Sequence, residues 1–116
     1  MLDLVIFDLD DIPAMTEPVM AVFYDHFCSS RDMWVLVGRS EEAREPTEDW
    51  LYKQGVYYNR LIMRPLGDER ASAELKLRWL HDGTVPRDRI LCAYANELPV
   101  VDMYRAEGIP CFHVLS

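Results

Sequence analysis

The chain has 116 residues, which is the size of a single domain. Half of its residues are hydrophobic and 28% are charged, as in a folded globular protein rather than a disordered one. Its formal net charge of −8 argues against a general binder of nucleic acids or of membrane surfaces. No apolar run approaches the length of a membrane span.

The charges are distributed unevenly along the chain. Residues 29–78 contain nine of the twelve basic side chains but only nine of the twenty acidic ones. The rest of the chain therefore carries three basic and eleven acidic side chains. An anionic ligand is expected to be tolerated best by the middle of the sequence.

The three cysteines, Cys28, Cys92 and Cys111, are far apart and form no CxxC motif. An odd number of cysteines gives no disulfide framework. Cys92 and Cys111 lie in apolar stretches, where we expect them to be small core residues. The pattern favours a reducing, cytoplasmic location.

The first predicted element is a strand over residues 4–7, an unbroken apolar run that is followed by Asp8 and Asp10. Such a run is typical of a strand covered on both faces, as in a parallel sheet between helices. Pro13 lacks a backbone donor and stops the strand. Two carboxylates at the end of a strand repel each other, and a bound divalent cation usually offsets this repulsion. The alternative is an acidic turn that binds no ligand.

The remaining elements alternate between helix and strand. A helix is expected from Thr16 to about Cys28 and a strand over 33–37 that ends in Gly38-Arg39-Ser40. There follow a loop over 41–47, a short helix over 48–54 capped by Thr47, a strand over 56–63, a helix over 70–82, a strand over 90–95, a helix over 99–107 and a strand over 110–115.

Each helix carries apolar residues at helical spacing, which we assign to core packing. The first helix is expected to bury Val19, Met20, Phe23 and Phe27, the third Ala71, Leu75, Trp79 and Leu80, and the last Val100, Val101, Met103 and Tyr104. His26 is interpreted as a residue at the end of a helix rather than as a ligand.

This alternation predicts one α/β domain, a Rossmann-like three-layer sandwich with a five-stranded parallel sheet and right-handed crossovers. The expected strand order is 3-2-1-4-5, which makes the first and fourth strands neighbours. Asp8 and Asp10 then lie close to Asn96, which follows the fourth strand. Ligands bind at this edge of open α/β sheets.

Several motifs follow one another along the chain. They are Asp8-x-Asp10, Val37-Gly38-Arg39, Gly67-Asp68-Glu69-Arg70 followed by Lys76, residues 100–105, and Gly108 with Cys111-Phe112. In this order and spacing they resemble the haloacid-dehalogenase (HAD) superfamily of phosphatases. Within that superfamily, the sequence is most similar to the phosphatase domain of phage-type polynucleotide kinase/phosphatase, over nearly the whole chain. The resemblance implies a capless HAD core over residues 1–116.

The resemblance implies a Mg²⁺-dependent phosphomonoester hydrolase that works through an aspartyl-phosphate. Asp8 would attack phosphorus, and Asp10 would act as the general acid and then the general base. Lys76 would offset negative charge on the nucleophile and the phosphoryl oxygens. Asp8, the backbone carbonyl of Asp10 and Asn96 would hold Mg²⁺.

The resemblance also implies a phosphorylated substrate, for which a nucleotide or the 3′ end of a nucleic acid is one class. Arg39 and Arg70 would grip phosphate with their planar guanidinium groups, and the backbone N–H of Gly38 would assist. No membrane partner is expected, and the oligomeric state stays open.

Departures from the family pattern support an alternative. Asp11 replaces the usual glycine, and Val37 stands where a Ser or Thr hydroxyl would bind the phosphoryl group. Ala95-Asn96 replaces an acidic pair, so the metal-ligand position contributes no charge. The alternative is a catalytically impaired relative that binds a phosphorylated ligand or a protein partner. A phosphoacceptor receiver domain shares the sheet order but fits the DxD motif poorly.

Taken singly, the basic candidates also have ordinary explanations. Lys76 is a solvated helix lysine in the simplest alternative, and Arg70 is a residue of the first helical turn. Arg39 is a loop cation that pairs with Glu41 or Glu42. Surface ion pairs of this kind are common and weak.

Overall fold

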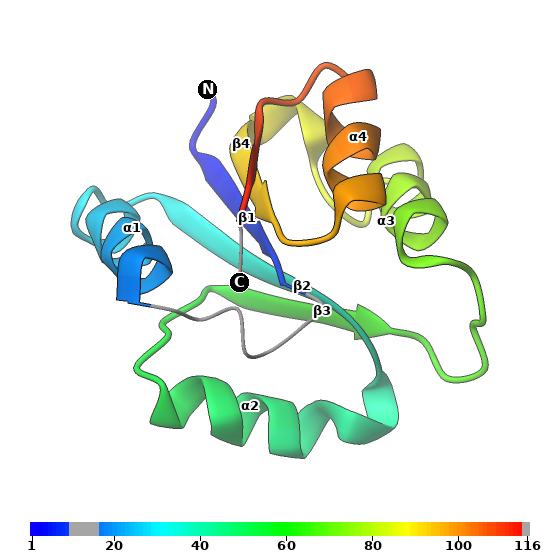
Figure 1. The fold of residues 1–116 in the computed structure, drawn as a ribbon, viewed down its shortest axis with the longest axis horizontal. Helices are drawn as coiled ribbons and strands as arrows, with labels where there is room; N and C mark the ends of the chain where they lie inside the picture. Colours follow the sequence, from blue (N-terminus) through cyan, green and yellow to red (C-terminus); the bar gives the residue numbers. More distant parts are fainter. Residues whose placement is uncertain (10–16, 115–116) are drawn as a thin grey trace.

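The computed structural model of the chain describes residues 1–9 and 17–114. Its centre is a five-stranded parallel sheet in the order β3-β2-β1-β4-β5 (Figure 1). This is the strand order that the sequence predicts. The strands are β1 (Leu4–Asp8), β2 (Asp32–Ser40), β3 (Arg60–Arg64), β4 (Ile90–Ala95) and β5 (Cys111–His113).

In the described part of the chain, four α-helices cover the two faces of the sheet. Helices α1 (Glu17–Cys28) and α2 (Arg44–Lys53) contribute buried residues to one apolar cluster. Helices α3 (Ser72–His81) and α4 (Leu98–Ala106) contribute to the other (Figure 1). Two 3₁₀ turns, Glu41–Ala43 and Arg87–Arg89, complete the described elements. Among the described residues, no helix is long and apolar enough to cross a membrane.

The side chains of the central strand β1 pack on alternate faces of the sheet. Side chains alternate between the faces of a sheet along a strand. Leu4 and Ile6 pack in the cluster with α3 and α4, whereas Val5 and Phe7 pack in the cluster with α1 and α2. All five residues of β1 are buried. The next position after Phe7 therefore directs Asp8 toward α3 and α4.

The structure corrects the prediction for residues 41–47, which form a 3₁₀ turn and the first turn of α2 rather than a loop. Pro46 lies in that first turn, where a helix does not need its N–H as a donor. Thr47 is not the N-cap but a buried residue inside α2, and its hydroxyl donates to the carbonyl of Ala43 at 2.7 Å. Pro46 therefore does not break this helix, although a proline in a helix interior usually does.

Smaller differences concern element lengths and helix faces. Strand β2 continues three residues beyond Val37, and β3 begins only at Arg60. Phe27, assigned to the core, is 46% exposed, because α1 buries Phe23 and His26 on its inner face instead. The side chain of Val19 and residue Leu115 lie outside the described part of the chain.

Most other core assignments are confirmed. In α3, Leu75, Trp79 and Leu80 are buried, although Ala71 precedes the helix and is exposed. Cys92 and Cys111 are buried core residues, as predicted, whereas Cys28 is exposed. Gly83 and Gly108 follow helices with φ angles of 85° and 79°, the left-handed conformation that commonly ends a helix.

His26 bridges α1 to the sheet. Its Nδ1 lies 3.1 Å from Nη1 of Arg31, and its Nε2 lies 3.0 Å from the hydroxyl of Tyr94. A guanidinium can only donate, so Nδ1 accepts and Nε2–H donates to Tyr94. Burial, followed by the charge of Arg31, lowers the pKa of His26 below its ordinary value of 6.5.

This network predicts a stability that depends on pH. Because the pKa of His26 is lower in the folded chain, the unfolded chain binds more protons below pH 6.5. The free energy of unfolding should therefore fall as the pH drops below that value. Urea unfolding at a series of pH values measures it, and His26→Gln should flatten the dependence. An equally steep dependence in the variant would contradict the assignment.

Candidate active site

A buried ion pair lies at the carboxyl end of β1. The Nζ atom of Lys76, on α3, lies 2.5 Å from Oδ1 of Asp8, and both side chains are 0% exposed. The two residues are 68 positions apart in sequence. Burying two charges carries a desolvation cost that only close pairing and further hydrogen bonds offset. Lys76 is thus not the solvated helix lysine of the simplest alternative.

A second donor holds the other oxygen of Asp8. The hydroxyl of Tyr104, on α4, donates to Oδ2 at 2.6 Å, and the tyrosine is fully buried. The apolar spacing of the last helix assigns Tyr104 to core packing and does not predict this contact. A tyrosine predicted to be buried should have indicated a polar partner, since a buried tyrosine hydroxyl usually forms a hydrogen bond.

Sheet register brings other candidates to the same edge. Asp8 lies opposite Leu36 of β2 and Ala95 of β4. Asn96 follows Ala95 directly and is half-buried. Gly38 lies two residues beyond Leu36. The edge therefore presents Asp8 from the central strand between segments that follow its two neighbours, as the predicted strand order requires.

Gly38 and Arg39 form a bulge near the end of β2. Val37 pairs with Met63 and Ser40 pairs with Arg64, so two residues of β2 lie between consecutive partners on β3. Bulges often occur next to active sites, where they redirect side chains. Arg39 is exposed in this bulge.

Arg64, at the end of β3, links the bulge to the loop before α3. Its Nε donates to the carbonyl of Gly38 at 2.7 Å. Its Nη1 donates to the carbonyls of Asp68 and Arg70 at 3.1 and 2.6 Å. A guanidinium provides several donors in a fixed plane, which suits it to joining two backbone segments.

Arg70 lies in that loop rather than in the first helical turn, since α3 begins at Ser72. It is exposed, and its Nη1 lies 3.9 Å from a carboxylate oxygen of Asp68. The structure thus joins Asp8 to Lys76 directly. It leaves Arg39 and Arg70 exposed on two segments that Arg64 holds together.

The donor chemistry at the edge suits a hard cation. Asp10, expected to be the general acid/base and a metal ligand, lies outside the described residues. Within the described residues, no group of three or more His, Cys, Asp or Glu side chains could hold a metal ion. Asp8 and Asn96 offer carboxylate and amide oxygens, which are donors that Mg²⁺ accepts. Asn96 is neutral, so it adds no negative charge at this edge.

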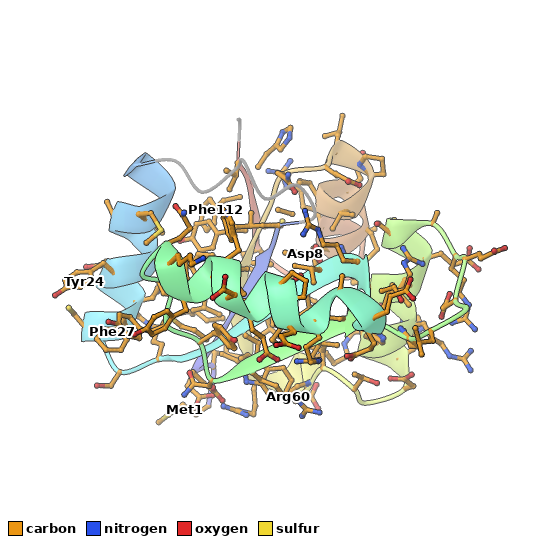
Figure 2. The ribbon with its side chains drawn as sticks, turned by 90° about the horizontal axis from the view of Figure 1, so that it is seen from below. Met1, Asp8, Tyr24, Phe27, Arg60 and Phe112 are labelled. Carbon is orange, nitrogen blue, oxygen red and sulfur yellow. The ribbon has the colours of Figure 1, made fainter. Side chains whose placement is uncertain are left out.

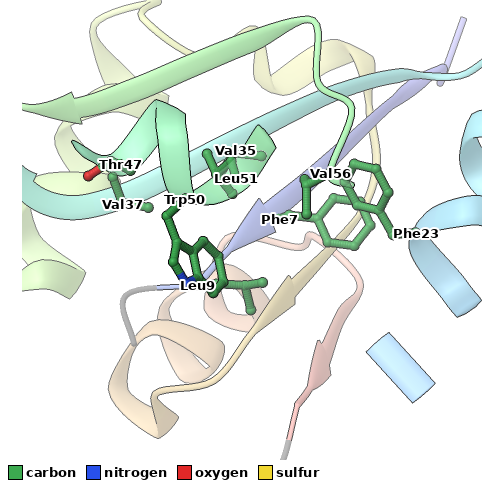
Figure 3. Close-up of a pocket in the computed structure, with 9 residues that line it drawn as sticks. All are labelled: Phe7, Leu9, Phe23, Val35, Val37, Thr47, Trp50, Leu51 and Val56. Atoms are coloured by element: carbon green, nitrogen blue, oxygen red, sulfur yellow. The ribbon is translucent and has the colours of Figure 1, made fainter. Parts of the chain in front are cut away.

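An apolar pocket lies on the opposite face of the sheet (Figure 3). Its described lining contains no charged side chain and includes Phe7, Val35, Trp50 and Leu51. The one hydroxyl in that lining, on Thr47, donates to a backbone carbonyl within α2. The described lining therefore offers no charged group to an ionic ligand, whereas Asp8 lies at the carboxyl edge of the sheet (Figure 2).

The buried pair predicts a large effect of removing one partner. Lys76→Met keeps the side-chain length but leaves the Asp8 carboxylate without its cation, which should cost about 3–5 kcal/mol of stability. The double variant with Asp8→Asn should lose less than the sum of the two single variants. Urea unfolding measures all three, with Lys53→Met as an exposed control whose lysine pairs with Asp49 at 2.9 Å. A Lys76→Met chain as stable as the wild type would contradict this assignment.

Comparisons with known proteins support the fold. Two solved structures, described as "Structure of the Pnkp1/Rnl/Hen1 RNA repair complex" and "Structure of Pnkp1/Rnl/Hen1 complex", contain chains that match with a TM-score of 0.85. They are 29% and 25% identical to this chain, and each alignment covers 98% of it. The alignments cover 43% and 46% of those longer chains, so this chain spans less than half of their length. No curated protein matches the chain.

A family model identifies the chain more directly. The model described as the polynucleotide kinase PNKP phosphatase domain matches residues 4–116, which include every described strand and helix. The chain therefore belongs to the family of polynucleotide kinase phosphatase domains, which are HAD-like proteins.

Proposed function

We propose that the chain hydrolyses phosphomonoesters with Asp8 as the nucleophile. Its membership of a phosphatase-domain family supports a phosphatase-like role. The observation that carries the residue assignment is the buried pair of Asp8 and Lys76 at the carboxyl end of β1. Ligands of open α/β sheets bind at this edge.

In the first step, an oxygen of Asp8 forms a bond to phosphorus, and the bond between phosphorus and the substrate oxygen breaks. Asp10 gives its proton to that departing oxygen. In the second step, a water oxygen bonds to phosphorus, the bond between phosphorus and Asp8 breaks, and Asp10 takes the proton of the water. The electron pair of the broken bond returns to the Asp8 carboxylate. Two displacements replace one that is more difficult.

The charge of Lys76 serves both steps. Its Nζ is fixed against Asp8 inside the protein, where water does not weaken the interaction. A cation fixed in advance stabilises developing negative charge without reorganising during the reaction. Mg²⁺ held by Asp8, the carbonyl of Asp10 and Asn96 would supply further positive charge beside the phosphoryl oxygens.

The phosphorylated end of a nucleic acid is the substrate class that we favour, specifically a 3′-phosphate. One similar solved structure is described as an RNA repair complex. Only residues 9–16 separate β1 from α1, so no cap domain is inserted there, and the edge is accessible to a polymer end. The exposed Arg39 and Arg70 are suited to the phosphates next to the reacting one.

We expect phosphate release that requires both Mg²⁺ and Asp8. The assay compares an oligonucleotide with a 3′-phosphate, the same oligonucleotide with a 5′-phosphate, and an aryl phosphate. Loss of the nucleophile in Asp8→Asn should lower the rate by roughly 10³-fold or more. Asp88→Asn, an exposed aspartate on the turn before β4, should retain full activity.

Two results would contradict the proposal. One is equal phosphate release by the wild type and Asp8→Asn. The other is no release from any substrate at millimolar Mg²⁺ while the chain is folded. Preference for the 5′-phosphate or the aryl phosphate would overturn only the proposed substrate class.

The neutral Asn96 predicts a high requirement for metal. Asn96→Asp adds one negative charge at the proposed metal ligand without changing the size of the side chain. The Mg²⁺ concentration that gives half-maximal activity should fall by about tenfold, since ligand charge sets affinity for hard cations. A titration of activity against Mg²⁺ measures the shift. An unchanged or higher requirement would remove Asn96 from the metal site.

A second candidate function is binding without catalysis. The observation in its favour is that Asp8 is buried and both of its oxygens accept hydrogen bonds from the protein. Such a network also serves a purely structural role. A folded chain that binds a 3′-phosphorylated oligonucleotide but releases no phosphate would establish this second function.

A further inference from the structure

Tyr104 is the residue of the Asp8 network to which the proposed mechanism gives no role. It is fully buried, and its hydroxyl lies 2.6 Å from Oδ2 of Asp8, while Lys76 lies 2.5 Å from Oδ1. The two donors come from different helices, α4 and α3, on the same face of the sheet. Each oxygen of the carboxylate therefore has its own protein donor.

We propose that Tyr104 is a positioning residue for the phosphorylation and dephosphorylation of Asp8, an inference that rests on the proposed function. Lys76 holds Oδ1, on one side of the carboxylate. The hydroxyl of Tyr104 fixes the second oxygen and with it the plane of the group. Displacing a reacting atom by about 1 Å can cost roughly 100-fold in rate.

The packing of Tyr104 does not by itself explain its hydroxyl. A phenylalanine would fill the same volume against the cluster that includes Val100 and Val101. A buried hydroxyl costs free energy unless it is hydrogen-bonded, so a core position without a role would favour phenylalanine. The contact with Asp8 gives the hydroxyl its partner.

The charge on Asp8 changes during the cycle, and Tyr104 responds to that change. A hydrogen bond to a carboxylate is about twice as strong as one to a neutral acceptor. Phosphorylated Asp8 has lost the carboxylate charge at its acyl group. When water attacks phosphorus, the electron pair of the phosphorus–Asp8 bond returns to the carboxylate, and Asp10 takes the proton of the water. Tyr104 thus stabilises Asp8 as the leaving group of the second step.

The chain offers a matched control. Tyr104→Phe removes the hydroxyl that contacts Asp8 and keeps the ring. Tyr94→Phe also removes one hydrogen-bonded hydroxyl, whose partner is His26 at 3.0 Å, and Tyr94 packs with the cluster on the other face of the sheet. Thermal unfolding curves of both variants identify a temperature at which both are folded, and the activity assays are carried out at that temperature.

We expect Tyr104→Phe to lower kcat by about tenfold while KM changes by less than about twofold, because the hydroxyl acts on the nucleophile and not on the substrate. Acid quenching in the steady state should trap a larger fraction of Tyr104→Phe chains as phosphoaspartate than of wild-type chains. Tyr94→Phe should match the wild type in kcat, in KM and in the trapped fraction.

A Tyr104→Phe chain with the kcat and trapped fraction of Tyr94→Phe would overturn the inference. A change in KM alone would also overturn it, since it would assign the hydroxyl to substrate binding. In both cases an active wild type keeps the proposed function intact. If the folded wild type releases no phosphate, the proposed function fails first, and the role of Tyr104 in it fails as a consequence.

Discussion

The structure depends on one electrostatic constraint, which is the burial of the Asp8 carboxylate at the end of the central strand. Asp8 ends a strand whose five residues are all buried, and its charge must be balanced inside the protein. Lys76 supplies the opposite charge and Tyr104 a further hydrogen bond. Because these donors lie on α3 and α4, the same contacts that satisfy Asp8 also fix both helices against the sheet.

The sequence predicted the sheet well, because its signals are local. Continuous apolar runs mark buried strands, and their alternation with helices leaves few possible strand orders. The errors also have local causes. A proline usually indicates the end of a helix, yet Pro46 lies in the first turn of α2, where a proline is tolerated. The helical spacing of apolar residues predicts that Phe27 is buried, but α1 buries His26 instead. Tyr94 and Arg31 form hydrogen bonds with the two ring nitrogens of His26.

The candidate site was only partly predictable, because its contacts join residues that are distant in sequence. Asp8 was identified from its place at the end of an apolar run and Lys76 through motif resemblance, and strand order placed Asn96 beside Asp8. The roles of Tyr104 and Arg64 depend on side-chain directions that sequence spacing does not encode. The site that results keeps its buried nucleophile candidate and cation, while the neighbouring acidic pair is replaced by Ala95 and Asn96. This combination agrees with the phosphatase activity and the weak metal binding that we propose.

The most direct test of the central claim is to identify the residue that becomes phosphorylated. The chain is quenched with acid during turnover of a 3′-phosphorylated oligonucleotide. Borohydride then reduces any acyl phosphate to an alcohol, and mass spectrometry of peptides locates it. The account predicts modification at Asp8, absent in the Asp8→Asn control. Phosphate release accompanied by modification at another residue, or by none at Asp8, would contradict it.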